Sequence, residues 1–325
     1  METRWQLRTS YSGPKPTAAL IHSSVSLPRI FLTFNRFFAL SSEMASRVWL
    51  ITGCSSGFGK CIAEAALRRG DVVVATARQV ATLADLESKS ALAYELDVTW
   101  PDEKLNGVVS DVLGKTGRID VLVNNAGYIL TGGIEEVSGK EVLHQYDTNV
   151  IGQLNVARAI LPHMRQKRAG VICNMASIGS WRGVPGAGIY CSSKAACSIN
   201  SEALRAEVAH LGIDVVAVEP GYFRTNFLTD SNRKRAQRRV PDISGPVDAA
   251  LSALDAKNCK QPGNPIVAAE LLVEALTHTG RCMGKTLPSR LALGNDAVHL
   301  IPSIMDQVRK DIDEWKALTG STDFE

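Results

Sequence analysis

Seven short apolar runs, each rich in Val, Ile, Leu or Ala, punctuate the chain, and longer stretches of helix-forming residues lie between most of them. The runs fall at about residues 47–52, 71–76, 91–96, 119–123, 170–176, 213–219 and 289–293. Continuous apolar strands of this kind are typical of a parallel sheet that is covered on both faces. The alternation continues without a linker or an internal repeat. It therefore predicts an α/β fold, a doubly wound parallel sheet of about seven strands flanked by helices.

Three of the intervening helices bear on function. The first spans residues 58–69, directly after the first apolar run. The second spans residues 190–211 and ends before Gly212, a residue type that often stops helices. The third is an amphipathic run at residues 296–318, which predicts a long C-terminal helix that could cover a pocket or join a subunit interface.

A glycine-rich turn separates the first run from the first helix. Residues 52–59 read Thr-Gly-Cys-Ser-Ser-Gly-Phe-Gly, so the glycines stand at G-x-x-x-G-x-G spacing. Glycines between a strand and a helix let backbone N–H groups approach a phosphate at the helix N-terminus. The spacing differs from both G-x-G-x-x-G and the P-loop, which indicates a different branch of nucleotide-binding folds.

A second constellation has the chemistry of a proton donor. Tyr190 and Lys194 lie four residues apart and share a face of the predicted helix, and Ser177 follows the apolar run 170–176. A phenol with a pKa of about 10 is a poor acid or base at neutral pH, and a nearby ammonium lowers that pKa. The Ser177 hydroxyl, at a strand's carboxyl end, could hydrogen-bond a reacting oxygen.

Further short motifs stand in the order typical of one family. They are Asn124-Asn125-Ala126-Gly127 after the fourth run, Asp97 after the third, Asn149 within Thr148-Asn149-Val150, and Pro220-Gly221 followed by Thr225. With these motifs, the chain from about residue 47 to 227 resembles the single-domain, oxidoreductase branch of the short-chain dehydrogenases/reductases. The resemblance extends more loosely to the C-terminus.

This resemblance implies a Rossmann-like fold and hydride transfer between a nicotinamide and a carbonyl or carbinol carbon, with no metal. Tyr190 would be the general acid/base, and Lys194 would lower its pKa and hold the nicotinamide ribose. Ser177 would orient the substrate carbonyl, and Asn149 would hold a water that relays the proton. The implied cofactor-binding residues are Thr52, Gly53, Ser55, Gly57, Phe58, Gly59, Arg78, Asp97, Asn124, Ala126, Gly127, Tyr190, Lys194, Pro220, Gly221 and Thr225.

The end of the second run bears on the choice of nicotinamide. An acidic residue there would bind the ribose 2′-OH of NAD, whereas an arginine accommodates the 2′-phosphate of NADP. Ala77 occupies the acidic position and Arg78 follows it. The sequence therefore favours NADP(H) over NAD(H), although Arg78 could also be a solvated residue at a helix start.

The leading hypothesis is an NADP-dependent carbonyl reductase or alcohol dehydrogenase. A rival class is a nucleotide-sensing regulatory protein that has lost catalysis, and another is a dehydratase or epimerase of the same fold. The intact set Asn149, Ser177, Tyr190 and Lys194 counts against the first rival. The sequence offers no additional catalytic feature for the second.

The substrate side is predicted to be apolar or aromatic, with flanking residues Tyr128, Ile129, Trp181, Val184 and Tyr222. By the resemblance, residues 222–246 form a lid over it. Basic residues cluster in that lid, from Arg233 to Arg239. The cluster could bind an anionic substrate, but a solvated helix face is the interpretation that we favour.

Residues 1–43 differ from the rest in composition. They contain five basic and two acidic residues and many Ser, which is the composition of an organellar transit peptide. Alternatively, Met44 is a natural start and the extension is a disordered tail or a mistaken gene start. The two interpretations predict mitochondrial and cytoplasmic locations, respectively. Residues 44–325 would form the single catalytic domain.

The remaining chain contains 31 basic and 31 acidic residues, which argues against nucleic acid as a partner. The apolar run 30–40 is too short to span a membrane. Seven cysteines form no C-x-x-C pair, as expected for small buried residues in a reducing compartment. A homo-oligomer is possible.

Overall fold

Neighbouring residues of the central strand point into two different apolar cores. In β1 (Val48–Ile51), Trp49 and Ile51 pack in one core, and Val48 and Leu50 pack in the other. Side chains alternate across a strand, so a strand that is buried on both faces must be apolar at every position. This explains why the predicted runs show no polar alternation.

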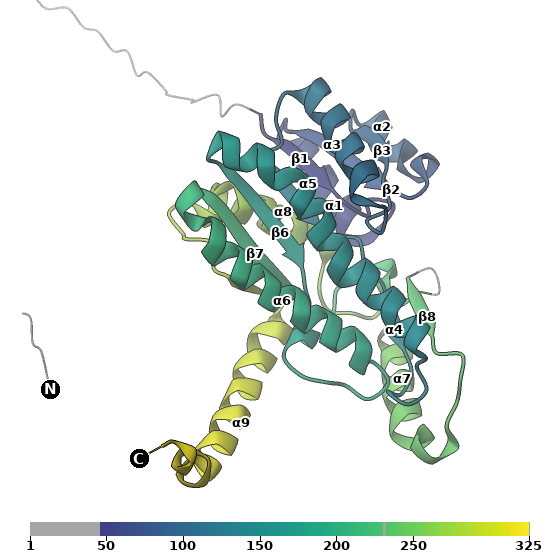
Figure 1. Ribbon diagram of the computed structural model, residues 1–325. Helices are drawn as coiled ribbons and strands as arrows, with labels where there is room; N and C mark the ends of the chain where they lie inside the picture. Colours follow the sequence, from purple (N-terminus) through teal and green to yellow (C-terminus); the bar gives the residue numbers. More distant parts are fainter. Residues whose placement is uncertain (1–45, 230–231, 325) are drawn as a thin grey trace, which may run out of the picture. The chain divides into compact units, whose positions relative to one another are not determined.

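The seven runs form one parallel sheet, as predicted, and every strand begins and ends within two residues of its expected bounds. After β1 the strands are β2 (Val72–Ala77), β3 (Leu92–Glu95), β4 (Val121–Asn124), β6 (Gly170–Met175), β7 (Ile213–Pro220) and β9 (Arg290–Leu293). Their order is β3-β2-β1-β4-β6-β7-β9 (Figure 1).

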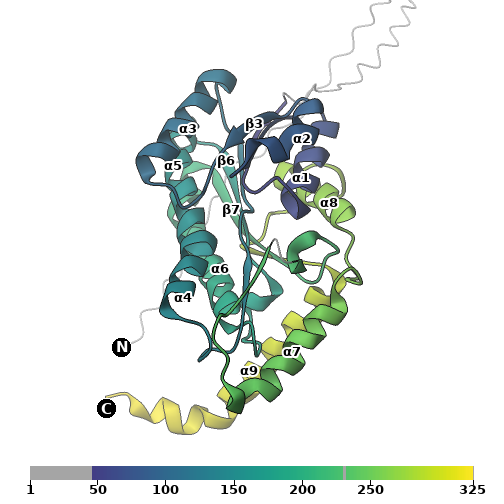
Figure 2. The ribbon, with the colours of Figure 1, turned by 90° about the vertical axis from the view of Figure 1, so that its right-hand side faces the viewer.

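Helices cover both faces of the sheet, which Figure 2 shows nearly edge-on. One face carries α3 (Asp102–Thr116), α5 (Gly152–Lys167) and α6 (Gly188–Val208). The other carries α1 (Gly57–Arg68), the short α2 (Ala84–Ser88) and α8 (Pro265–Thr277). The doubly wound architecture is thereby confirmed.

The order of the strands reverses at β1, which pairs with β2 on one side and with β4 on the other. The chain reaches the sheet edge at β3 and then returns to the far side of β1. The chain that follows β1 therefore enters α1 on one face of the sheet, and the chain that follows β4 leads to α5 on the other face (Figure 2). Open α/β sheets bind their ligands at the carboxyl ends of the strands beside such a reversal.

A smaller layer lies beyond the carboxyl ends of the sheet. β5 (Ile129–Thr131) pairs in parallel with β8 (Arg233–Arg235), and α4 (Gly139–Tyr146) and α7 (Ser244–Lys257) lie beside this pair (Figure 1). Each of these strands has only three residues, and the sequence pattern did not predict them. The region expected to be a lid is thus partly a strand.

The computed structural model describes residues 46–229 and 232–324, which belong to one compact unit, Ala45–Glu325. The expectations for residues 1–43 lie outside the described residues. The predicted C-terminal helix is α9 (Asn295–Thr319). Among the described residues, no helix is both long enough and apolar enough to cross a membrane.

Candidate active site

The glycine turn after β1 packs against the loop after β4 more closely than side chains would allow. Gly53 has a φ of +70°, and a Cβ there would lie 3.0 Å from the Ala126 Cα. A Cβ on Gly59 would lie 2.5 Å from the Asn125 Nδ2 and from the Gly53 carbonyl oxygen. The loops after β1 and β4 therefore form one tightly packed unit.

Hydrogen bonds hold this unit together. The Thr52 Oγ1 accepts bonds from the backbone N–H groups of Asn125 and Ala126, at 2.9 and 3.0 Å. In return, the Asn125 Nδ2 donates to the carbonyl oxygens of Thr52 and Gly53, at 2.8 and 3.0 Å. The sequence placed Asn125 in a motif but did not reveal that its side chain supports the turn.

The N-terminus of α1 is suited to an anion. No side chain caps the helix at Ser56, which leaves the first N–H groups available to a ligand. Ser55 is exposed beside it, and the Phe58 ring packs edge-on against Phe223, with centroids 5.0 Å apart. The uncapped helix start is compatible with the predicted pyrophosphate site, which stays a prediction.

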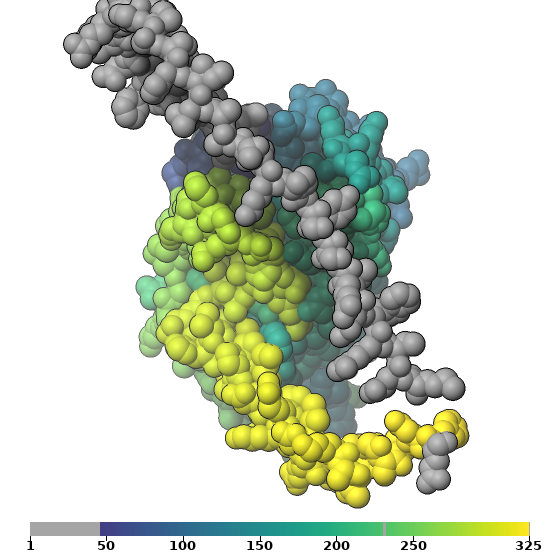
Figure 3. Space-filling model, turned by 90° about the vertical axis from the view of Figure 1, so that its left-hand side faces the viewer, coloured from purple at the N-terminus to yellow at the C-terminus, as the bar shows by residue number. Residues whose placement is uncertain are grey.

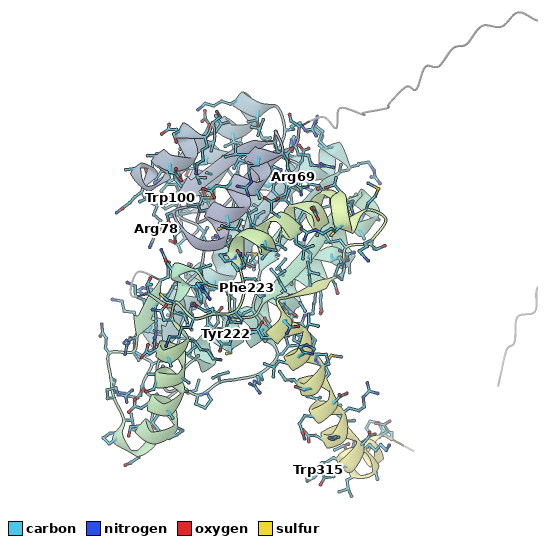
Figure 4. All side chains as sticks on the ribbon, turned by 180° about the vertical axis from the view of Figure 1, so that it is seen from behind. Arg69, Arg78, Trp100, Tyr222, Phe223 and Trp315 are labelled. Carbon is cyan, nitrogen blue, oxygen red and sulfur yellow. The ribbon has the colours of Figure 1, made fainter. Side chains whose placement is uncertain are left out.

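The next two strands end in Arg78 and Asp97. Ala77 is buried, whereas Arg78 is exposed and forms no hydrogen bond or ion pair with any described residue (Figure 4). The Asp97 Oδ1 accepts bonds from the backbone N–H and the hydroxyl of Thr99, at 2.9 and 2.8 Å. A free guanidinium therefore stands at the strand end where the cofactor ribose is expected.

The loop after β7 closes over the glycine turn. A Cβ on Gly57 would lie 3.6 Å from the Thr225 Cβ, which places Thr225 beside the turn. Gly221, which follows Pro220, lies so close to the Asp296 carboxylate that any side chain would overlap it. Asp296 also accepts a bond from the Tyr222 N–H at 2.7 Å, a contact that the sequence did not predict.

Tyr190 and Ser177 meet at the carboxyl end of β6. Tyr190 lies near the start of α6 and is 9% exposed. Burial raises the pKa of its phenol, and a hydrogen bond with Ser177 acts in the opposite direction. The Ser177 Oγ also accepts a bond from the Gly179 N–H at 3.0 Å, which fixes its position.

Lys194 lies one turn further along α6 and is also buried. Its Nζ donates to the Met175 carbonyl oxygen at 2.6 Å, and burial lowers its pKa. We expected this ammonium to lower the pKa of Tyr190. In the described part of the chain, a hydrogen bond with Ser177 lowers the pKa of Tyr190, and the effect expected of Lys194 stays a prediction.

Asn149 lies in a π-helical turn, Asp147–Ile151, between α4 and α5. Such wide turns often occur at functional sites. The Asn149 Nδ2 donates to the Tyr128 carbonyl oxygen and to the Ser193 Oγ, at 3.0 and 3.2 Å, and its Oδ1 accepts from the Tyr128 N–H. Asn149 thus fixes the loop after β4.

Gly127 shows how closely the predicted groups converge. A Cβ at this position would lie 3.0 Å from the Asn149 Oδ1 and 3.6 Å from the Lys194 Nζ. Residues predicted from three separate motifs therefore lie within a few ångströms of one another. Among the described residues, no group of His, Cys, Asp and Glu side chains is arranged to hold a metal.

A buried polar ladder lies beneath these residues. The Asn124 Nδ2 donates to the Asn174 Oδ1, and the Asn174 Nδ2 donates to the Ser201 Oγ, both at 2.9 Å. The ladder connects β4, β6 and α6. Its sequence signal was an asparagine within the otherwise apolar run 170–176, whose role was not recognised.

A second buried cluster centres on Glu219, which is 1% exposed in β7. Its carboxylate accepts bonds from the Trp181 indole at 2.6 Å and from the Ser198 hydroxyl at 2.8 Å. The Arg290 Nε lies 3.1 Å from the same carboxylate, and its guanidinium lies over the Trp181 ring at 4.4 Å. This cluster, which the sequence did not predict, fixes the segment that follows Ser177.

The substrate side of Tyr190 is apolar. The rings of Tyr190 and Phe227 lie 5.8 Å apart, and Ile129 and Val184 belong to the same cluster. Tyr222 packs nearby on the apolar face of α7 and lies between α7 and α9 in Figure 4. Of the predicted lining residues, Trp181 differs, because its indole N–H binds Glu219.

The basic cluster of the lid is not a helix face, so the interpretation that we favoured is wrong. Arg233 is buried in β8 and pairs with Asp255, and Arg235 lies 3.8 Å from the same carboxylate. Arg239 pairs with the buried Glu136 at 3.1 Å. Carboxylates of this chain therefore already neutralise these arginines, which argues against a handle for an anionic substrate.

Comparison with known proteins agrees with this arrangement. A family model described as short chain dehydrogenase matches residues 47–236. Oxidoreductase BOA17 of Botryotinia fuckeliana is 34% identical over 282 residues, which cover 84% of this chain and 98% of that protein. The NADPH-dependent pterin aldehyde reductase of Arabidopsis thaliana is 36% identical over 196 residues, which cover 59% of this chain and 81% of that protein.

A solved structure matches across most of the chain. The short-chain dehydrogenase of Streptomyces avermitilis superposes with a TM-score of 0.78 at 38% identity. The match covers 86% of this chain and 99% of that one.

Proposed function

Because this chain belongs to the short-chain dehydrogenase/reductase family, we propose that it is an NADP(H)-dependent enzyme that interconverts a ketone or aldehyde and an alcohol. The chain is an oxidoreductase of CH–OH or carbonyl groups, and the proposal adds the cofactor preference and the residue roles. One observation carries it: Tyr190 and Ser177 are both buried at the carboxyl end of the sheet, and Ser177 acts on the pKa of the Tyr190 phenol.

Tyr190 is the general acid in the direction of carbonyl reduction. Burial raises the pKa of its phenol, so the side chain is fully protonated at neutral pH and can donate to a forming alkoxide. Ser177, held by the Gly179 N–H, hydrogen-bonds the same oxygen and orients the carbonyl. The apolar surroundings of Phe227 and Val184 exclude water from the reacting atoms.

Lys194 and Asn149 support this proton donor. The buried Lys194 ammonium, held by the Met175 carbonyl, would bind the nicotinamide ribose and stabilise a phenolate at Tyr190. Asn149 fixes the loop at Tyr128 and would hold the water through which the proton is replaced. A nicotinamide supplies the hydride when it is bound.

Several backbone and side-chain groups of the chain suit the parts of a dinucleotide. The glycine turn and the uncapped start of α1 suit a pyrophosphate, and Thr225 lies beside the turn. By the family resemblance, Asp97 would contact the adenine. Arg78 favours NADP(H), because its guanidinium has no partner in the part of the chain that the structure describes and can donate two hydrogen bonds to a 2′-phosphate. The Arabidopsis relative is named as NADPH-dependent, which supports the same choice.

An apolar or aromatic carbonyl compound is the proposed substrate, since the surface beside Tyr190 is built from Ile129, Val184, Tyr222 and Phe227. A cytoplasmic location is proposed as well, because all seven cysteines are free, as in a reducing compartment. Mitochondrial import is the alternative, should residues 1–43 direct it.

The deciding experiment is a screen of aliphatic and aromatic ketones and aldehydes that follows the absorbance of NADPH or NADH. Turnover with NADPH that disappears in the Tyr190→Phe variant supports the proposal. Binding of NADPH without turnover of any carbonyl or alcohol would instead favour a regulatory, nucleotide-sensing protein.

A further inference from the structure

The C-terminal helix leaves the body of the protein after its second turn. Within α9 only Ala297 and Ile301 are buried, and Pro302 marks the point where the helix departs. Figure 1 shows α9 extending away from the sheet, and Figure 3 shows its yellow residues projecting from the lower edge. A helix of this length is marginally stable in water unless its apolar face is covered.

The uncovered part carries the repeat of a coiled coil. Apolar positions alternate at spacings of three and four residues, and Thr319 closes the series: Val298, Ile301, Met305, Val308, Ile312, Trp315 and Thr319. Met305, Val308, Ile312 and Trp315 are each about half exposed, at 47%, 51%, 61% and 57%. The opposite face is polar, with Asp306, Gln307, Lys310, Asp313 and Glu314. Ile301 is buried against the body, so the part of this a/d seam that is free to meet a partner covers the two heptads from Met305 onward.

We propose that α9 pairs with the α9 of a second copy of this chain in a parallel, two-stranded coiled coil. The seam of one helix packs against the seam of the other along residues 305–319, with Trp315 near the outer end (Figure 4). The proposal is independent of the reaction that the enzyme catalyses.

The flanking charges select the second copy and its direction. Arg309 and Lys316 lie on one side of the seam, and Asp311 lies on the other. In a parallel pair, opposite flanks meet, so Asp311 of each copy faces Lys316 of the other. In an antiparallel pair, like flanks meet, and Arg309 and Lys316 would face their own counterparts with the same charge.

The present contacts of these charges do not oppose the pairing. Lys316 lies 3.0 Å from Asp313 within the same helix, and Asp311 accepts a bond from Gln307 at 2.8 Å. All four side chains are exposed, and exposed pairs of this kind contribute little stability. They can therefore be exchanged for contacts between helices.

A hollow lies between the middle of α9 and Trp181, beside the seam. Its volume is about 360 Å³, and it is lined by Trp181 and, on α9, by Ile304, Met305, Val308, Arg309, Ile312 and Asp313. Trp181 belongs to the segment that follows Ser177 and is bound to Glu219. The paired helix would thus cover one side of the segment that supports the substrate site.

Analytical ultracentrifugation of the full chain tests the association. The wild type should sediment as a dimer, and Val308→Asp should raise the dissociation constant about a hundredfold or more, because it buries a charge in the seam. Lys310→Asp places the same carboxylate on the outer face and is the matched control. Because α9 beyond Ile301 is not buried in the body, both variants should keep the thermal midpoint of the body.

A charge exchange tests the direction. Asp311→Lys and Lys316→Asp should each weaken the dimer, and the variant that carries both changes should recover it. Asp306→Lys, on the outer face, should leave it unchanged. In a Cys259→Ser background, single cysteines at Met305 and at Thr319 should each form a disulfide between copies, which an antiparallel pair could not allow at both positions.

A monomer at micromolar concentration would overturn the proposal, including a monomer whose seam is covered by the chain's own residues before 46. A dimer that is insensitive to Val308→Asp would place the interface elsewhere and would overturn it as well. The parallel pairing would be excluded if the variant with both charge changes did not regain the dimer and if no disulfide formed between copies at position 305 or at position 319.

Discussion

Burial of the Lys194 ammonium opposes the stability of the folded chain. Its pKa is lowered in the folded state, so the folded protein binds this proton less tightly than the unfolded chain does. The resulting cost is present at neutral pH and disappears as the pH rises from the folded pKa to the ordinary value for lysine. A functional role would explain why the chain keeps this charge.

Lys194→Met should therefore raise the thermal midpoint at neutral pH while it abolishes most turnover. Each kcal/mol gained in the free energy of unfolding should raise the thermal midpoint by about 2–4 °C. The gain over wild type should shrink as the pH rises toward that of free lysine. Calorimetry across pH checks this, and a variant that is less stable at neutral pH would mean that the bond to the Met175 carbonyl outweighs the burial of charge.

Tyr190→Phe should reduce turnover by at least about a thousandfold, since general acid catalysis contributes factors of this order. The ring contact with Phe227 is kept, so NADPH affinity and stability should change little. Steady-state kinetics and fluorescence titration with NADPH measure the two effects. Residual turnover near the wild-type rate would remove Tyr190 from the mechanism.

Arg78→Ala should weaken NADPH binding about ten- to a hundredfold and leave NADH binding almost unchanged, because a hydrogen bond to a charged group contributes about 1.5–3 kcal/mol. Since Arg78 has no partner among the described residues, the change should not affect folding. Measuring KM for NADPH and for NADH in the wild type and in the variant checks this prediction. Equal losses for both would contradict the assigned 2′-phosphate contact.

At the scale of elements, the lid is held by a carboxylate from outside it. Glu136 accepts bonds from the Gly133 N–H at 2.8 Å and the Val240 N–H at 3.1 Å, and it pairs with Arg239. These backbone bonds and the arginine hold the pKa of Glu136 below its usual range. Its contribution to stability is therefore present above the ordinary pKa of glutamate and is lost as the pH falls through the lowered one.

Glu136→Gln should weaken this attachment by about 1–3 kcal/mol. Hydrogen exchange should then increase in residues 233–243 and remain unchanged in β1 and β4. The wild type should show the same local increase at acidic pH. Glu135→Gln, a change at the exposed neighbouring carboxylate, is the matched control. Unchanged exchange in the lid would show that β8 is held by its pairing with β5 alone.

The sequence predicted the strands well because burial on both faces leaves uninterrupted apolar runs. It predicted the candidate site because the cofactor and proton-transfer motifs are local. The prediction for the basic residues of the lid was wrong for the opposite reason, because their partners are distant in the sequence. Arg233 is neutralised by Asp255, about twenty residues away, and Arg239 by Glu136, about one hundred residues away. Likewise, the role of Glu219 depends on Trp181, Ser198 and Arg290, which only the fold brings together.

At the scale of the whole molecule, a chain that starts at Met44 should fold and turn over like the full chain. The first strand begins at Val48, and the contacts just before it come from Arg47, whose N–H donates to Asp71 and whose guanidinium donates to the Thr277 carbonyl. Circular dichroism, thermal midpoint and kinetics measure this. A chain that starts at Val48 is the control and should be less stable.

If the chain from Met44 unfolds or loses activity, residues 1–43 must support the domain, and the division at Met44 is wrong.

The polar ladder beneath the site has a consequence for how the sheet assembles. Shifting β4 by two residues along β6 would keep every side chain on its own face, so apolar burial alone would tolerate the error. The bond between Asn124 and Asn174, however, forms in one register only, and a buried amide without a partner costs about 1–3 kcal/mol. The ladder thus penalises a shifted register of β4 against β6 during folding. Once the bond between Asn124 and Asn174 has formed, β4 and β6 end level with each other, so the loops after Asn124 and Met175 begin side by side.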